Sequence, residues 1–134
     1  MLRNDEIKKG LVSYTKARSD ITNEVGSSEI RESQWQGTNF SYPNIRIRVL
    51  SNRPFGGRNC NVSQIEVSFL VFSELGSSQE ADEIAGIIND VYEDRGFTSE
   101  GITFKLWSQN LIPAIRADRR TWRAEVVLSG LASE

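Results

Sequence analysis

Two segments of the chain carry apolar side chains at the spacing of an amphipathic helix. In residues 4–18, Ile7, Leu11 and Tyr14 stand at i, i+4 and i+7, so they share one face of a helix. Asn4 precedes this stripe, and a side-chain oxygen at that position can cap the first turn. The pattern predicts a helix that begins at Asn4 and packs a narrow apolar stripe on the core.

The second helical pattern lies between Ser77 and Gly96. Its apolar positions are spaced i, i+3, i+4, i+7 and i+8, and they are Ile84, Ile87, Ile88, Val91 and Tyr92. Ser77 and Glu80 have the spacing of a capping box, and Gly96 suits the left-handed conformation that ends many helices. We expect a helix between these signals, with its acidic residues in solvent.

Alternation of apolar and basic residues predicts a strand that starts near Pro43. Ile45 and Ile47 are separated by Arg46 and Arg48. A period of two places the isoleucines on the buried face of a sheet and the arginines on the other face.

Three further segments have the pattern of strands. Residues 64–72 are apolar on both faces toward their end, which is typical of a central strand, and residues 102–107 and 122–128 alternate. Residues 53–61 contain proline and two glycines, so we expect the flexible tip of a long hairpin there. We interpret residues 108–121 as a connection.

The remaining N-terminal part is less regular. Residues 19–28 are polar apart from Ile21 and Val25, and residues 29–35 can form a short strand. Neither repeats nor a linker divide the chain, so we expect a single domain, 1–134. The element order predicts an α+β fold: a mostly antiparallel mixed β-sheet of about 4–5 strands with two α-helices packed on one face.

Composition narrows the possible chemistry. The net charge of −2 gives no overall attraction to nucleic acid. Histidine is absent, which removes the most versatile acid-base group and the commonest transition-metal ligand. The single cysteine, Cys60, allows no internal disulfide, and there is no signal-peptide or membrane-spanning pattern. We therefore expect a soluble intracellular protein from a reducing compartment.

No constellation of residues has the pattern of an active site. A reactive Cys60 has no histidine to activate it, and Gly56-Gly57 lacks the spacing of a phosphate-binding loop. The acidic residues of the second helix are those of a solvated helix face. We expect no enzyme activity, no catalytic or metal-binding residue and no cofactor.

Two groups of residues remain as candidates for binding. One is the basic cluster Arg116, Arg119, Arg120 and Arg123, and the other is the aromatic group Trp35, Phe40 and Tyr42. The arginines can be solubilising charge, a protein interface or a DNA-facing patch. The aromatic residues can cap the core or anchor an interface.

Three segments in order resemble one protein family. They are Glu29–Ile47, Ile65–Glu74 leading into Ser77–Ala81, and Arg116–Leu128. Together they resemble the tail terminator, or tail-completion, proteins of long-tailed bacteriophages, whose archetype is the lambda tail terminator. The resemblance spans about residues 1–130 and includes no catalytic motif.

The resemblance implies a virion structural protein of the phage tail and neck, assembled in the host cytoplasm. Such subunits form a homo-hexameric ring that caps the tail tube, ends its polymerisation and joins the tail to the neck or connector protein. Genome DNA passes through the lumen without sequence-specific binding, and no membrane is involved. The 53–61 tip and the 108–121 connection would correspond to the family's contact regions by their position in the fold.

Candidate assembly-interface residues follow from these patterns taken together. They are Trp35, Phe40, Tyr42, Arg46, Arg48, Phe55, Arg58, Arg116, Arg119 and Arg120. Two other functions stay open: a head-completion or neck connector protein, and a small enzyme or nucleic-acid-binding module that uses the arginine cluster.

Overall fold

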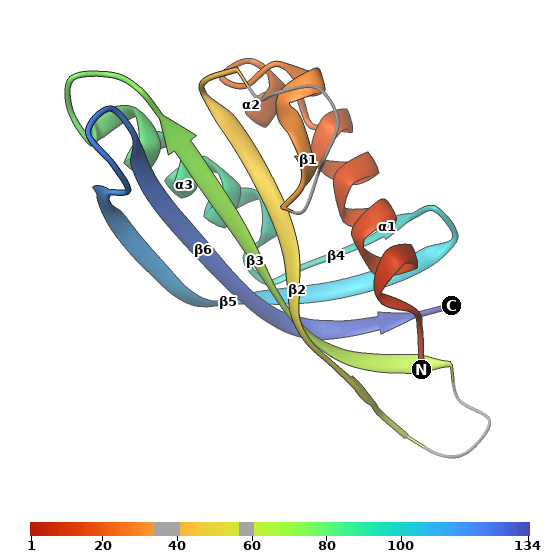
Figure 1. Ribbon diagram of the computed structural model, residues 1–134. Helices are drawn as coiled ribbons and strands as arrows, with labels where there is room; N and C mark the ends of the chain where they lie inside the picture. Colours follow the sequence, from red (N-terminus) through yellow and green to blue (C-terminus); the bar gives the residue numbers. More distant parts are fainter. Residues whose placement is uncertain (34–40, 57–60) are drawn as a thin grey trace.

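The computed structural model describes residues 1–33, 41–56 and 61–134. Within these residues, six strands form one mixed sheet in the order β1-β2-β3-β6-β5-β4 (Figure 1). The elements in chain order are α1 (Asn4–Ala17), α2 (Ser19–Thr22), a 3-10 turn (Ser27–Glu29), β1 (Ile30–Glu32), β2 (Asn44–Pro54), β3 (Val62–Ser73), α3 (Gln79–Tyr92), β4 (Arg95–Ser99), β5 (Ile102–Arg116) and β6 (Trp122–Ser133). The α+β class is confirmed, with more strands than expected and a third, short helix.

Helix α1 follows its predicted range and stripe. Ile7 and Leu11 are fully buried, and Tyr14 packs against the core cluster. The predicted cap is wrong, because Arg3 occupies the N-cap position and makes no side-chain cap bond. The Asn4 side chain instead accepts a hydrogen bond from Asn52 of β2 at 2.8 Å. Asn4 thus fastens the start of the helix to the sheet.

Helix α3 also buries its predicted stripe, but both of its predicted end signals are wrong. Ser78 is the N-cap, and the Glu80 carboxylate accepts a bond from Ser73 at 2.7 Å, so it does not close a capping box with Ser77. At the other end Asp94, with φ of 51°, takes the left-handed conformation. Gly96 lies in β4.

The two strands predicted in the middle of the chain, and the hairpin between them, are confirmed. Strands β2 and β3 pair antiparallel along almost their whole length as a hairpin, and β3 is central between β2 and β6. Strand β1 runs parallel to β2, which makes the sheet mixed. The hairpin end extends past α1 in Figure 1, and residues 57–60 of its tip lie outside the described part.

The predicted connection at residues 108–121 is wrong for most of its length. Strand β5 continues to Arg116, and only residues 117–121 form the turn into β6. Two register shifts, between Ser108 and Asn110 and between Ile112 and Ile115, break the period of two in this strand. Such bulges also accommodate a proline inside a strand, because the bulged residue need not donate to the ladder.

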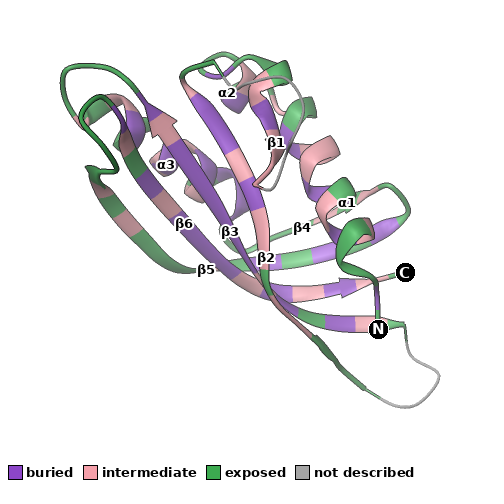
Figure 2. Ribbon diagram, in the orientation of Figure 1, coloured by how far each residue is buried: buried purple, intermediate pink, exposed green. Residues whose placement is uncertain are grey.

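The helices α1 and α3 cover one face of the twisted sheet, and the core lies between them (Figure 2). Its centre is an aromatic group in which the Tyr92 ring lies 4.9 Å from that of Phe69 and 5.8 Å from that of Tyr14. The Tyr92 hydroxyl meets the hydroxyl of Thr15, so the buried polar end of the ring is satisfied. Ile21 and Val25 are buried as expected.

Candidate functional site on the open face of the sheet

The face of the sheet opposite α1 and α3 carries the outward side chains of the alternating strands, which are basic in the first part of β2 and partly apolar in β3 and β6. We call it the open face, and its central residues are Arg46, Arg48, Ser68, Leu70, Phe72, Arg123, Glu125 and Val127. The period of two that buries Ile45 and Ile47 under the helices turns Arg46 and Arg48 to this side. The placement of both arginines, predicted from the sequence, is confirmed.

A polar network crosses the centre of the open face. The Arg48 guanidinium on β2 donates to the Glu125 carboxylate on β6 at 3.0 Å, and Ser68 on the intervening β3 donates to the same carboxylate oxygen. Burial alone would raise the pKa of Glu125, but the bonds from Ser68 and Arg48 and the nearby arginine charges outweigh it and hold that pKa below its ordinary value. This network of an arginine, a serine and an ionised glutamate therefore connects β2, β3 and β6.

Two other arginines lie over aromatic rings at one end of the sheet: Arg46 on the open face, and Arg116 on the helix side, where its partner Trp122 packs against the core. The guanidinium carbon of Arg46 is 4.1 Å from the ring centre of Phe72, and that of Arg116 is 4.9 Å from that of Trp122. Arg46 also donates to Asn44, and Arg116 donates to the backbone carbonyl of Arg119. These contacts hold planar cations at the surface, where a partner's carboxylates can reach them.

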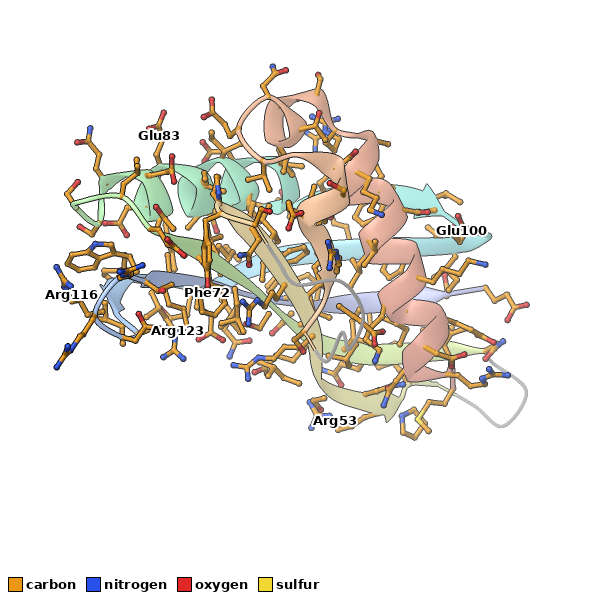
Figure 3. All side chains as sticks on the ribbon, turned by 45° about the horizontal axis from the view of Figure 1, so that its top comes forward. Arg53, Phe72, Glu83, Glu100, Arg116 and Arg123 are labelled. Atoms are coloured by element: carbon orange, nitrogen blue, oxygen red, sulfur yellow. The ribbon has the colours of Figure 1, made fainter. Side chains whose placement is uncertain are left out.

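The turn between β5 and β6 adds two more arginines to the same end of the sheet, and the start of β6 adds a third. Asp118 accepts the backbone N–H groups of Arg120 and Thr121, at 2.9 and 3.0 Å, and these bonds lower the pKa of its carboxyl group. The turn presents Arg119 and Arg120 in exposed positions, and the exposed Arg123 follows in β6. Figure 3 shows Arg116 and Arg123 together at this end. We call Arg116, Arg119, Arg120 and Arg123 the arginine end.

The other predicted interface residues divide between two regions. Tyr42 is exposed just before β2, and its neighbour Asn44 pairs with Phe72, so it belongs to the end of the sheet that carries the arginines. Phe55 is 48% exposed at the far end of the β2–β3 hairpin. Trp35, Phe40 and Arg58 lie outside the described residues.

The sequence patterns missed one surface, the outer edge of β5. Strand β4 pairs with β5 only as far as Leu106, so the following residues pair only with β6 in the described part of the chain. The strand exposes Trp107, Leu111 and Ile115, at 42%, 44% and 52%. Trp107 and Ile115 lie on the open face, because they pair with Ser129 and Arg123, and Leu111 lies on the helix side opposite Val126. One backbone N–H along this edge, that of Ala114, donates to Asp82 of α3 at 2.8 Å. The second half of β5 could not be predicted as a strand, because the bulges break its two-residue period.

The described residues contain no cluster of three or more histidine, cysteine, aspartate or glutamate side chains arranged to hold a metal ion. Among them there is also no helix with the length and apolar character needed to cross a bilayer.

Comparison with known proteins gives structural matches only. No protein-family model matches the chain, and no curated protein matches its sequence. A chain from the virion of a native gene transfer agent particle superposes with a TM-score of 0.70 over 92% of both chains, at 12% identity. This chain shares its fold with that virion component. A second solved structure covers 100% of this chain and 97% of its own, with a TM-score of 0.54 at 15% identity.

Proposed function

We propose that the protein is a structural component of a tailed, phage-like particle, and specifically the tail terminator that caps the tail tube. The observation that carries the proposal is the fold shared with a gene transfer agent virion chain over 92% of both chains. Near-complete coverage at 12% identity means that the whole domain, and not one motif, is common to the two proteins. The three sequence segments that resemble tail terminators support the finer assignment.

The open face and the edge of β5 supply what a ring subunit needs. A closed ring is built from heterologous contacts, in which two different surfaces of neighbouring copies meet. The uncovered sheet face, with Arg46 fixed over Phe72 and the exposed Arg123 beside it, is one such surface. The edge of β5 beyond Leu106, which β4 does not cover, is another, because unpaired strand edges bind other chains readily.

The β2–β3 hairpin is the element we assign to the tail tube. It extends beyond the helices in Figure 1 and carries the exposed Phe55 next to Pro54, the last residue of β2. In this proposal six copies form the ring, the hairpins contact the last ring of tube subunits, and the opposite side of the ring meets the neck. DNA passes through the lumen, the protein resides in the virion, and it acts by binding and not by catalysis.

The test is polymerisation of the particle's tail-tube protein with and without this protein. We expect added protein to limit tube length and to appear in electron micrographs as a six-fold ring at the tube end. Phe55→Ser should lose this capping, whereas Lys16→Ser, at an exposed position on α1, should keep it. Tubes of unchanged length with no ring would refute the proposal.

Two other results would redirect the assignment. Binding to the head or portal without binding to the tube would indicate the head-completion or neck connector function. A salt-sensitive DNA affinity that is lost when Arg116, Arg119 and Arg120 become alanine would indicate a nucleic-acid-binding module.

A further inference from the structure

Exposed acidic residues predominate on α3, and exposed arginines gather around the turn between β5 and β6. Helix α3 spans 14 residues with no lysine or arginine, and Glu83, Asp90 and the following Glu93 are exposed. We call these three residues the acidic side of α3. Arg123 lies on the other side of the α3–sheet unit, because α3 packs under β3, β6 and β5 while Arg123 points away from it. Arg119 and Arg120 lie in the adjoining turn, and Arg116, over Trp122, lies on the α3 side.

The two charged sets also lie near the same end of the molecule. Figure 3 shows Glu83 and Arg116 at this end, and the bond from Ala114 to Asp82 joins the start of α3 to β5 just before the arginine turn. Each set has one large exposed apolar side chain beside it: Leu75, 56% exposed, precedes α3, and Ile115, 52% exposed, precedes Arg116. An apolar anchor within a charged rim is the usual composition of a protein interface.

Charge complementarity favours a second copy of this chain as the occupant. Opposite charges on opposite sides of a two-layer unit attract when copies stack in the same orientation, helix layer against open sheet. Two copies that met through the same side would instead place like charges together, which opposes a two-fold dimer. Nucleic acid would meet the arginine end but would be repelled by the acidic residues of α3 near that end.

We propose that the acidic side of α3 in one copy docks on Arg119, Arg120 and Arg123 of the arginine end in the next copy. The contact is heterologous, so it repeats from copy to copy and closes into a ring when the rotation between neighbours allows it. The inference rests on the proposed function for the ring, and it adds which two surfaces of the subunit meet.

Charge exchange between the two surfaces tests the contact. Arg119→Glu with Arg120→Glu lowers the formal net charge from −2 to −6, and Glu83→Arg with Asp90→Arg raises it to +2. We expect each double variant alone to stay monomeric in sedimentation velocity at about 50 mM salt, where screening of exposed charges is weak. An equimolar mixture of the two should associate, and so should the quadruple variant that carries both exchanges. Circular dichroism and thermal melts confirm that each variant is folded.

A matched control removes the effect of net charge. Lys9→Glu with Lys16→Glu also gives −6, but at exposed positions on α1. Both proposed surfaces are intact in this variant, so it should associate by itself as the wild type does, whereas the Arg119→Glu, Arg120→Glu variant of the same net charge should stay monomeric. Equal self-association of these two variants, or no association in the mixture of the two charge-exchange variants, would overturn the proposed contact.

The result is separable from the test of tail capping. If the wild-type protein caps tubes while the charge exchange has no effect on association, the contact is wrong and the proposed function stands. If the charge exchange behaves as described but the protein leaves tube length unchanged, the contact stands and the tail-capping function fails.

Discussion

Replacing Arg48 on the open face should lower the free energy of unfolding, and the exposure of its ion pair with Glu125 gives the size of the loss. The Arg48 side chain is 42% exposed, whereas that of Glu125 is 15% exposed. Arg48→Met keeps the aliphatic stem but leaves Glu125 mostly buried, with Ser68 as its remaining donor. Exposed ion pairs contribute about 0–1 kcal/mol, and breaking a buried one costs about 3–5 kcal/mol. For this half-buried pair we expect a loss of about 1–2 kcal/mol in the free energy of unfolding at pH 7.

The loss should depend on pH with a definite sign. The pKa of Glu125 is lower in the folded protein than its ordinary value of 4.5, so the network stabilises the fold fully above that value. As the pH falls through the folded-state pKa, the carboxylate is protonated and the stabilisation is lost. The difference between wild type and Arg48→Met should therefore shrink in acid.

Urea unfolding of four proteins measures the coupling in a double-mutant cycle. These are wild type, Arg48→Met, Glu125→Gln and the double variant, and we expect a coupling free energy of about 1 kcal/mol at pH 7. Arg53→Met is the matched control, since Arg53 is exposed in the same strand as Arg48, and it should change stability by less than about 0.5 kcal/mol. Additive effects of Arg48 and Glu125, or an equal loss for Arg53→Met, would refute the network.

Three further substitutions test the packing. Gly130→Ala should destabilise by about 3 kcal/mol or more in urea unfolding, because a Cβ there would lie 2.0 Å from the carbonyl oxygen of Lys105. Gly86→Ala in α3 meets nothing within 4 Å and should stabilise by up to about 1 kcal/mol. Thr15→Val leaves the Tyr92 hydroxyl without its buried partner, and a thermal melt should show a loss of about 1–3 kcal/mol.

Strands with unbroken alternation could be predicted from the sequence, and strands with bulges could not. Residues 45–49 keep a strict two-residue period, residues 64–69 keep one before both faces become apolar, and both segments lie in the strands expected of them. Strand β5 shifts register twice, so its second half lost the period and was interpreted as a connection. Strand β4 is five residues long and mostly exposed, so it carries little apolar pattern to detect.

The predictions of the helix ends were wrong for a different reason. The pattern around Ser77 and Glu80 describes local bonds, but the Glu80 carboxylate finds its donor in Ser73 at the end of β3. Asn4 likewise bonds to Asn52, which is 48 residues away in the chain. Long-range partners replaced the local caps, and local spacing does not reveal them.

The candidate site could be predicted in part. Arg46 and Arg48 were assigned to the open face from the period of two alone, and Arg116, Arg119 and Arg120 do lie together. That Arg48 meets Glu125, or that Arg116 lies over Trp122, depends on the register between strands, which one sequence does not contain.

Imaging of particles produced without this gene tests tail capping most directly. In cells that make the particle, deletion of the gene should leave tail tubes of uncontrolled length that fail to join heads, and the protein supplied from a plasmid should restore tails of uniform length. Particles with heads joined to tails of normal length in the absence of the protein would contradict its assignment as the tail terminator.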